Sequence, residues 1–186
     1  VLELANACSE YKNEVAAVAS WDVVPYILNY RRSQLPIDYK SRHMVSAQVR
    51  CDSVTLNSAL NTLGEKHPKL LFVEFCETDY YGHHGKWNEY LNAAHQNDAF
   101  IRKLWQYCQN DEFYKGNTTF IITCDHGRGK SLGLHINRGE VDPAASWTEH
   151  GQHIAGSNQT WLVAFGKDIQ HLGEVEGGKT IYTKQI

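Results

Sequence analysis

The sequence predicts an α/β fold, built on a mostly parallel sheet with helices on both faces. Residues 69–76 and 118–124 are short, nearly continuous apolar runs, as expected of strands buried on both sides. An amphipathic segment at 87–109, long enough for a crossover helix, separates the two runs. Strands that alternate with helices in this way are typical of parallel sheets, and the fold class follows from that alternation.

The chain before the first of these runs predicts a helix, a strand and a shorter helix. Residues 2–13 have helical spacing, and residues 15–20 (VAAVAS) are an apolar run of strand length. Asp22 is placed to cap a short helix that extends through Tyr30. Residues 31–50 are polar and irregular, and we expect no regular element there.

A longer helix is predicted from Asp52 or Ser53 to about Lys66, ahead of the strand at 69–76. Its expected apolar side consists of Val54, Leu56, Leu60 and Leu63. After the strand, we expect a polar, histidine-rich loop and then the helix at 87–109. Apolar residues in that last helix recur every three or four positions, so one side of it should face the core.

The last third of the chain predicts a long loop followed by a third strand. Residues 125–150 are rich in glycine and mostly irregular, and residues 160–165 (TWLVAF) have the composition of a strand. No internal repeat, linker or low-complexity tract interrupts residues 1–186, so we expect a single α/β unit. The first residues begin within a helical pattern and the last end without a terminator. We therefore expect the unit to be part of a longer protein, truncated at both ends.

Composition narrows the classes of partner. The formal net charge of -3 provides no basic surface for a nucleic acid polymer, and no apolar run approaches the roughly 20 residues of a membrane span. The five cysteines are widely spaced and form no CxxC pair, which argues against a zinc ribbon or a disulfide scaffold. These observations argue against a nucleic acid polymer and a membrane span, and they leave the oligomeric state and the redox compartment open.

Three polar clusters lie next to the predicted strands. Residues 77–84 (ETDYYGHH) and 125–129 (DHGRG) each follow a strand directly, and residues 147–153 (WTEHGQH) precede one. Ligands of open α/β sheets bind outside the carboxyl ends of the strands. The clusters therefore stand where a binding site is expected.

The residue types in these clusters suit a divalent metal. Carboxylate oxygen and imidazole nitrogen together favour Zn²⁺ or Mn²⁺, and neither ion requires a thiolate. In the motif Asp79-x-x-Gly82-His83, we expect the glycine to let the chain fold back, so that both side chains reach one ion.

Asp125 and His126 are adjacent, and adjacent side chains point to opposite faces of a regular strand. At a strand end that turns into a loop they can converge, and Gly127 and Gly129 would give the backbone the freedom to turn. Each motif alone has an ordinary interpretation. An Asp-His pair is usually a turn or a helix cap, and a loop histidine such as His150 is usually solvated. The combination of three clusters is what favours metal binding.

The same residues carry a family resemblance. The runs D-Y-Y-G-H, T-C-D-H-G-R-G and E-H-G-Q-H…G-S…W-L-V-A-F-G are similar to the second half of the alkaline phosphatase superfamily. That superfamily includes type I phosphodiesterases/nucleotide pyrophosphatases and cofactor-independent phosphoglycerate mutases. The phrase A-S-W-D-V-V-P-Y-I-L-N near the start resembles phosphoglyceromutase-like bacterial proteins. The resemblance covers nearly the whole chain.

The resemblance implies two divalent metal ions in neighbouring sites, Zn²⁺ or Mn²⁺. It assigns Asp79, His83 and His150 to one ion, and Asp125 and His126 to the other. His153 is an alternative ligand in place of His150, but the His-Gly at 150–151 matches the closer relatives and favours His150.

The resemblance assigns no catalytic residue to this chain. The superfamily's nucleophile, a Thr or Ser at a helix N-terminus, and one further carboxylate ligand lie upstream of these motifs. We therefore expect residues 1–186 alone to be inactive or nearly so. Arg128 either contacts substrate or braces its loop, and His84 either faces solvent or supports a ligand.

The implied activity is that of a phosphoric ester hydrolase, a phosphatase or phosphodiesterase. A phosphoglycerate mutase and a sulfatase of the same superfamily are alternatives, and neither substrate nor ester type follows from the sequence. A non-catalytic binding module is a second alternative, in which aromatic residues form a binding surface. Helix or strand spacing instead favours a core position for Trp87, Trp105 and Trp161. Because relatives are often exported, a periplasmic or extracellular location is expected.

Overall fold

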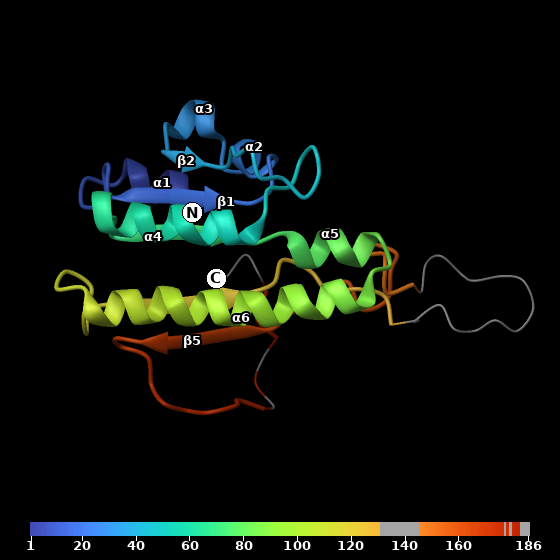
Figure 1. Cartoon of the computed structure of the whole chain (residues 1–186). Helices are drawn as coiled ribbons and strands as arrows, with labels where there is room; N and C mark the ends of the chain where they lie inside the picture. Colours follow the sequence, from blue (N-terminus) through green and yellow to red (C-terminus); the bar gives the residue numbers. More distant parts are fainter. Residues whose placement is uncertain (131–145, 177, 179, 183–186) are drawn as a thin grey trace, which may run out of the picture. The chain divides into compact units, whose positions relative to one another are not determined.

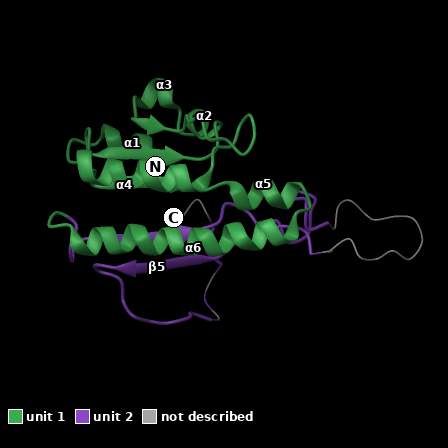
Figure 2. Cartoon of the chain, viewed as in Figure 1, with its two compact units in different colours: residues 1–113 green, residues 114–186 purple. Residues whose placement is uncertain are grey.

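The computed structural model describes residues 1–130, 146–176, 178 and 180–182. The chain divides into two compact units, Val1–Phe113 and Tyr114–Ile186 (Figure 2). The single α/β unit that the sequence leads us to expect over residues 1–186 stays a prediction.

The first unit contains a parallel three-stranded sheet flanked by helices, as the fold class predicted (Figure 1). Its strands are β1 (Val15–Ala19), β2 (Ile37–Asp38) and β3 (Leu70–Glu74), in the order β2-β1-β3. β1 pairs in register with β3 along its whole length. Because β1 is the central strand, all five of its residues are buried, which explains its uniformly apolar sequence VAAVA.

Helix α1 (Leu2–Ala7) is shorter than the helix expected at residues 2–13. Its Leu2 packs into a core cluster with Val15 and Leu35, and the half-buried Ala5 packs against the same cluster. Strand β2 also lies within a segment for which no regular element was expected. Two residues paired with a central strand are too short for a sequence pattern to reveal.

The short helix expected through Tyr30 is two four-residue helices, α2 (Val24–Ile27) and α3 (Tyr30–Ser33). Asn29 adopts a left-handed conformation with φ of 51° and separates them. The prediction that Asp22 caps this segment is wrong. Val23 occupies the N-cap position without a side-chain hydrogen bond, and a proline begins the first turn.

Helix α4 (Asp52–Lys66) has the predicted bounds, and it ends where His67 turns left-handed before Pro68. Its buried face differs from the expected one. Leu56 and Leu63 are buried as predicted, whereas Val54 and Leu60 are only half-buried. The remaining buried positions of this helix are Asp52, Thr55, Ala59 and Thr62, because a buried polar network occupies part of this face.

Helix α5 (Glu77–His83) replaces the loop expected after β3, and that prediction is wrong. Its polar, glycine-containing sequence has little intrinsic helix preference, so contacts from elsewhere in the fold must support it. The long helix α6 (Trp87–Asn110) follows, as predicted. Trp87, expected in the core, is 44% exposed and stacks on Tyr90.

The second unit contains an antiparallel pair, β4 (Thr119–Thr123) and β5 (Leu162–Gly166). Both strands were predicted, but β4 is not buried on both faces, since its residues alternate between exposed and half-buried. Ile121 is 58% exposed, and Trp161, expected in the core, is also exposed. Residues 131–145 of the predicted glycine-rich loop lie outside the described residues.

In the part of the chain that the structure describes, no helix has the length and apolar character needed to cross a membrane. Within the same part, the five cysteines form no disulfide bond. Cys76 is buried where β3 leads into α5, whereas Cys124 at the end of β4 is only half-buried.

Candidate metal centre

Helix α5 brings the first predicted ligand pair together. Asp79 and His83 are one turn apart, and the carboxylate Oδ2 lies 3.5 Å from the imidazole Nε2. Both side chains are about one-third exposed, so they are accessible to an ion from solvent. The expected mechanism, a backbone fold at Gly82, is wrong because Gly82 lies within the helix. The four-residue helical repeat places the two side chains on one face instead.

His84, next to this pair, is held by its own helix. Its Nδ1 lies 2.7 Å from the carbonyl oxygen of Tyr80, and its ring packs on the Tyr80 ring at 4.2 Å between centroids. This contact favours a supporting role for His84 beside the candidate ligands Asp79 and His83.

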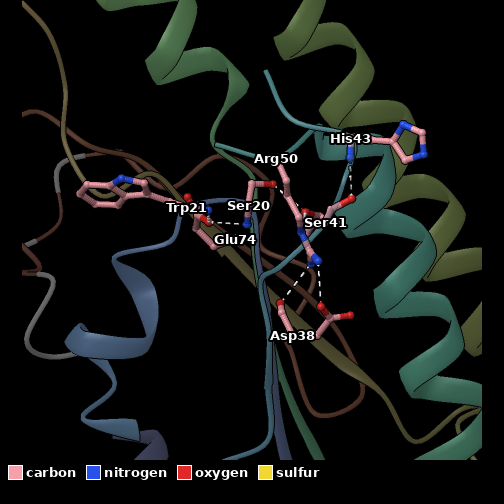
Figure 3. Close-up of polar contacts among 8 residues, drawn as sticks. Ser20, Trp21, Asp38, Ser41, His43, Arg50 and Glu74 are labelled. Atoms are coloured by element: carbon pink, nitrogen blue, oxygen red, sulfur yellow. Dashed lines mark hydrogen bonds and ion pairs between the residues drawn. The ribbon is translucent and has the colours of Figure 1, made fainter. Parts of the chain in front are cut away.

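A buried polar network lies at the carboxyl ends of the three strands of the first unit (Figure 3). The Arg50 guanidinium is fully buried and donates to the carboxylate of Asp38 at 2.9 Å and to its carbonyl oxygen at 3.0 Å. It also donates through Nε to the Thr55 hydroxyl at 2.8 Å. A buried charge is tolerated only when paired in this way, so Arg50 fixes the end of β2 against α4.

Two carboxylates, those of Glu74 at the end of β3 and Asp52 at the start of α4, bind the residues that follow β1 and extend this network. Glu74 Oε2 accepts hydrogen bonds from the backbone N–H groups of Ser20 and Trp21 at 2.9 and 3.1 Å (Figure 3). The Ser20 hydroxyl donates to Asp52 Oδ1 at 2.6 Å. Burial raises the pKa of Asp52 above its ordinary value, and the hydrogen bonds that its carboxylate accepts oppose that rise.

In the second unit, Asp125 and His126 lie just past the end of β4, in irregular backbone as predicted. The Asp125 carboxylate accepts the His126 backbone N–H at 3.0 Å, and its other oxygen lies 3.4 Å from the His126 Nε2. The adjacent side chains thus converge, as they could not on a regular strand.

His150 joins this pair. Its ring stacks on the His126 ring with 3.6 Å between centroids and 14° between planes. The two imidazoles come from segments 24 positions apart, so the contact is a product of the loop fold. His150 is half-buried, whereas the alternative ligand His153 is exposed. The stacking places His150, rather than His153, beside the Asp125–His126 pair.

Gly127 matters for a different reason from the expected one. Its φ is not positive, so conformational freedom is not what the turn requires. The Gly127 N–H donates to the Ser157 carbonyl at 2.8 Å, and a Cβ atom would lie 2.2 Å from the Gly156 carbonyl oxygen. Glycine is needed here because two backbone segments approach closely.

The loop that carries His150 is also tied to the residues after His126. The Arg128 guanidinium donates to the Thr148 carbonyl at 2.9 Å, and the Gly129 N–H donates to the Glu149 carbonyl at 3.1 Å. Of the two roles left open for Arg128, these contacts favour bracing of the loop.

The sequence pattern does not reveal the buried polar network at the starts of α4 and α5. Arg50 ends a segment predicted to be irregular and Asp52 begins a predicted helix, and neither position suggests that both side chains are almost fully buried. The one available signal was a pair of charged residues directly ahead of an amphipathic helix, and that pattern usually marks a solvated helix end.

Carboxylate–imidazole pairs on an α/β framework define a class of protein that binds divalent metal through oxygen and nitrogen ligands. The chain belongs to the Metalloenzyme superfamily, whose sequence profile matches residues 14–153. The resemblance to the alkaline phosphatase superfamily stated above is thereby confirmed.

A curated relative is also similar. The chain is 33% identical over 70 residues to a 2,3-bisphosphoglycerate-independent phosphoglycerate mutase of Gracilaria tenuistipitata var. liui. The match covers 38% of this chain and 13% of the relative. The chain thus spans only a small part of the length of the curated relative.

Proposed function

We propose that the protein acts on a small-molecule phosphate ester with two divalent metal ions, Zn²⁺ or Mn²⁺. In this proposal Asp79, His83 and His150 hold one ion, and Asp125 and His126 hold the other. The observation that carries the proposal is the pairing of a carboxylate with an imidazole at 3.5 Å in one unit and 3.4 Å in the other. Membership of a metal-dependent superfamily supports it.

Each pair offers the donor set that a divalent ion needs. The carboxylates of Asp79 and Asp125 supply negative charge, and the neutral imidazoles of His83 and His126 each supply one ring nitrogen. Metal binding requires the imidazoles to be unprotonated, because the ring nitrogen must offer its lone pair to the ion. When bound, two such ions neutralise the charge that develops on phosphoryl oxygens and align an in-line displacement.

Metal content tests the ligand assignment. Purified protein loaded with Mn²⁺ and gel-filtered should retain more than one ion per chain, measured by elemental analysis. Asp79→Ala and Asp125→Ala should each lower that stoichiometry. Asp98→Ala, which removes an exposed carboxylate of α6, is the matched control and should leave it unchanged. Full stoichiometry in both ligand variants would refute the ligand assignment, whereas a parent chain that retains no metal would favour a binding module.

Two reaction classes fit the same ligands. A hydrolase would release phosphate from aryl phosphate or cleave an aryl phosphodiester. A mutase is favoured by the similarity to the phosphoglycerate mutase, and it would interconvert phosphoglycerates with little net release of phosphate. Parallel assays of aryl phosphate, aryl phosphodiester, aryl sulfate and 3-phosphoglycerate separate these classes from each other and from a sulfatase.

A further inference from the structure

We infer that Asp52 is a positioning residue, which fixes the start of helix α5 and thereby the placement of Asp79 and His83. The inference rests on the proposed function, since it assumes that these two side chains bind metal. It assigns a supporting role at this site to a residue outside the candidate ligand set.

The starts of helices α4 and α5 are joined by hydrogen bonds in both directions. Asp52 Oδ1 accepts the Cys76 backbone N–H at 2.9 Å, and Oδ2 accepts the Glu77 N–H at 3.1 Å. In return, Glu77 Oε1 accepts the Asp52 backbone N–H at 3.0 Å. Each helix thus begins against a carboxylate that the other helix supplies.

Helix α5 depends on this external carboxylate. The helix has seven residues, and its own N-cap residue, Cys76, makes no side-chain capping hydrogen bond. The first N–H groups of any helix lack intrahelical partners, and helices this short are marginal without outside support. Asp52 satisfies two of those N–H groups, and its negative charge is also favourable at a helix N-terminus.

Asp52 itself is held rigidly. It is 1% exposed, and its Oδ1 also accepts the hydroxyl of Ser20, the residue that follows β1. Ser20 Oγ lies 2.7 Å from the Thr55 hydroxyl, which in turn accepts from the buried Arg50. The contacts at the carboxyl end of β1 therefore determine where α5 starts.

The position at which α5 starts determines where the side chains of the two proposed ligands lie. Asp79 lies in the first turn, two residues after Glu77, and His83 is the last residue of the helix. A shift of the helix start by one residue would rotate both side chains by about 100° around the axis. Loss of a residue that orients metal ligands commonly costs 10- to 100-fold in affinity, so we expect about a tenfold loss.

Asp52→Asn is the direct test. The substitution preserves shape but turns one carboxylate oxygen into an NH₂ group, which cannot accept a hydrogen bond from the backbone. The measurement is the rise in melting temperature when Mn²⁺ is added, together with the Mn²⁺ dissociation constant from titration. Asp98→Asn on α6 removes one exposed carboxylate charge and serves as the matched control.

The metal-induced rise separates positioning from ordinary stabilisation. Ligand binding raises stability by an amount set by its affinity for the folded state. If Asp52 positions α5, the Asn variant should bind Mn²⁺ about tenfold more weakly and show a smaller rise. If Asp52 only stabilises the fold, the melting temperatures with and without metal fall equally and the dissociation constant is unchanged, which refutes the inference.

Asp79→Ala shows which proposal has failed. If Asp79→Ala weakens Mn²⁺ binding and Asp52→Asn does not, the positioning role is refuted and the ligand assignment stands. If Asp79→Ala has no effect on Mn²⁺ binding, the ligand assignment itself is wrong.

A second pair of variants applies if Asp52→Asn does not fold. Glu77→Gln keeps an oxygen that can accept the Asp52 N–H, whereas Glu77→Ala removes it. Positioning through the hydrogen bond predicts weaker Mn²⁺ binding in Glu77→Ala than in Glu77→Gln. Equal affinities in the two variants would contradict it.

Discussion

The two units present their candidate ligands on different kinds of backbone. In the first unit, Asp79 and His83 lie one turn apart on α5, so the helical repeat sets their spacing. In the second unit, Asp125, His126 and His150 lie in irregular segments, and contacts between loops bring them together. The helical pair therefore depends on contacts at the start of α5, whereas the loop residues depend on contacts at several points along their segments.

The largest expected effect comes from removal of a ligand in either unit. In a longer chain that includes the nucleophile expected upstream, Asp79→Ala and Asp125→Ala should each lower phosphoester turnover at least about 100-fold, because each removes electrostatic stabilisation of the transition state. The measurement is steady-state turnover at saturating Mn²⁺, with Asp98→Ala as the control. If either variant retains the parental rate, that unit's carboxylate is not part of the metal centre.

Gly127→Ala tests the backbone contacts that hold the loop residues of the second unit together. The new Cβ would lie 2.2 Å from one backbone carbonyl oxygen and 2.5 Å from another, so the segments must separate. Overpacking of this kind typically costs about 1–3 kcal/mol, measured as the free energy of unfolding in urea. Gly178→Ala, where nothing lies within 4 Å of the added atom, is the control and should change little. A neutral Gly127→Ala would show that the two loops are not held closely in solution.

Arg128→Ala tests whether the brace on the His150 loop supports metal binding. The variant loses the hydrogen bond to the Thr148 carbonyl, so His150 should be less well placed. We expect Mn²⁺ affinity to fall about tenfold, as for other supporting residues. Arg102→Ala removes a similar charge from an exposed ion pair with Asp98 and should leave affinity unchanged. If turnover falls while affinity is unchanged, Arg128 contacts substrate instead.

The smallest expected effect is a pH dependence from Asp52 in the first unit. Burial raises the pKa of Asp52, so the folded state binds its proton more tightly than the unfolded state. The resulting stabilisation is present below the ordinary pKa of the group and is lost as pH rises through the raised pKa. Relative to Asp52→Asn, the parent chain should therefore lose stability as pH rises, by at most about 1.4 kcal/mol per pH unit. A difference that grows in the parent's favour would show that the hydrogen bonds outweigh burial.

Strong, long patterns were the ones that the sequence predicted well. Helix α4 and helix α6 were predicted within a residue or two, and every strand of more than two residues was expected. Helix α5 was missed because its seven residues show no apolar periodicity. Its support comes from Asp52, which is 25 positions away from Glu77 along the chain.

The candidate ligands also divide into those that a local motif predicts and those that only long-range contacts bring together. Asp79 with His83, and Asp125 with His126, could be singled out because their spacing within each motif is short. The stacking of His150 on His126, and the brace from Arg128, depend on how two loops meet, and local sequence does not encode that.

The α/β class, the carboxylate and imidazole types at the strand ends and membership of a metal-dependent family all follow from the sequence, because hydrophobic periodicity and ligand chemistry are properties of neighbouring residues. The folded chain alone reveals that α5 is a helix, that Gly127 permits a close backbone approach and that a buried Asp52 supports the helix start. Those features depend on hydrogen bonds and contacts between residues far apart along the chain.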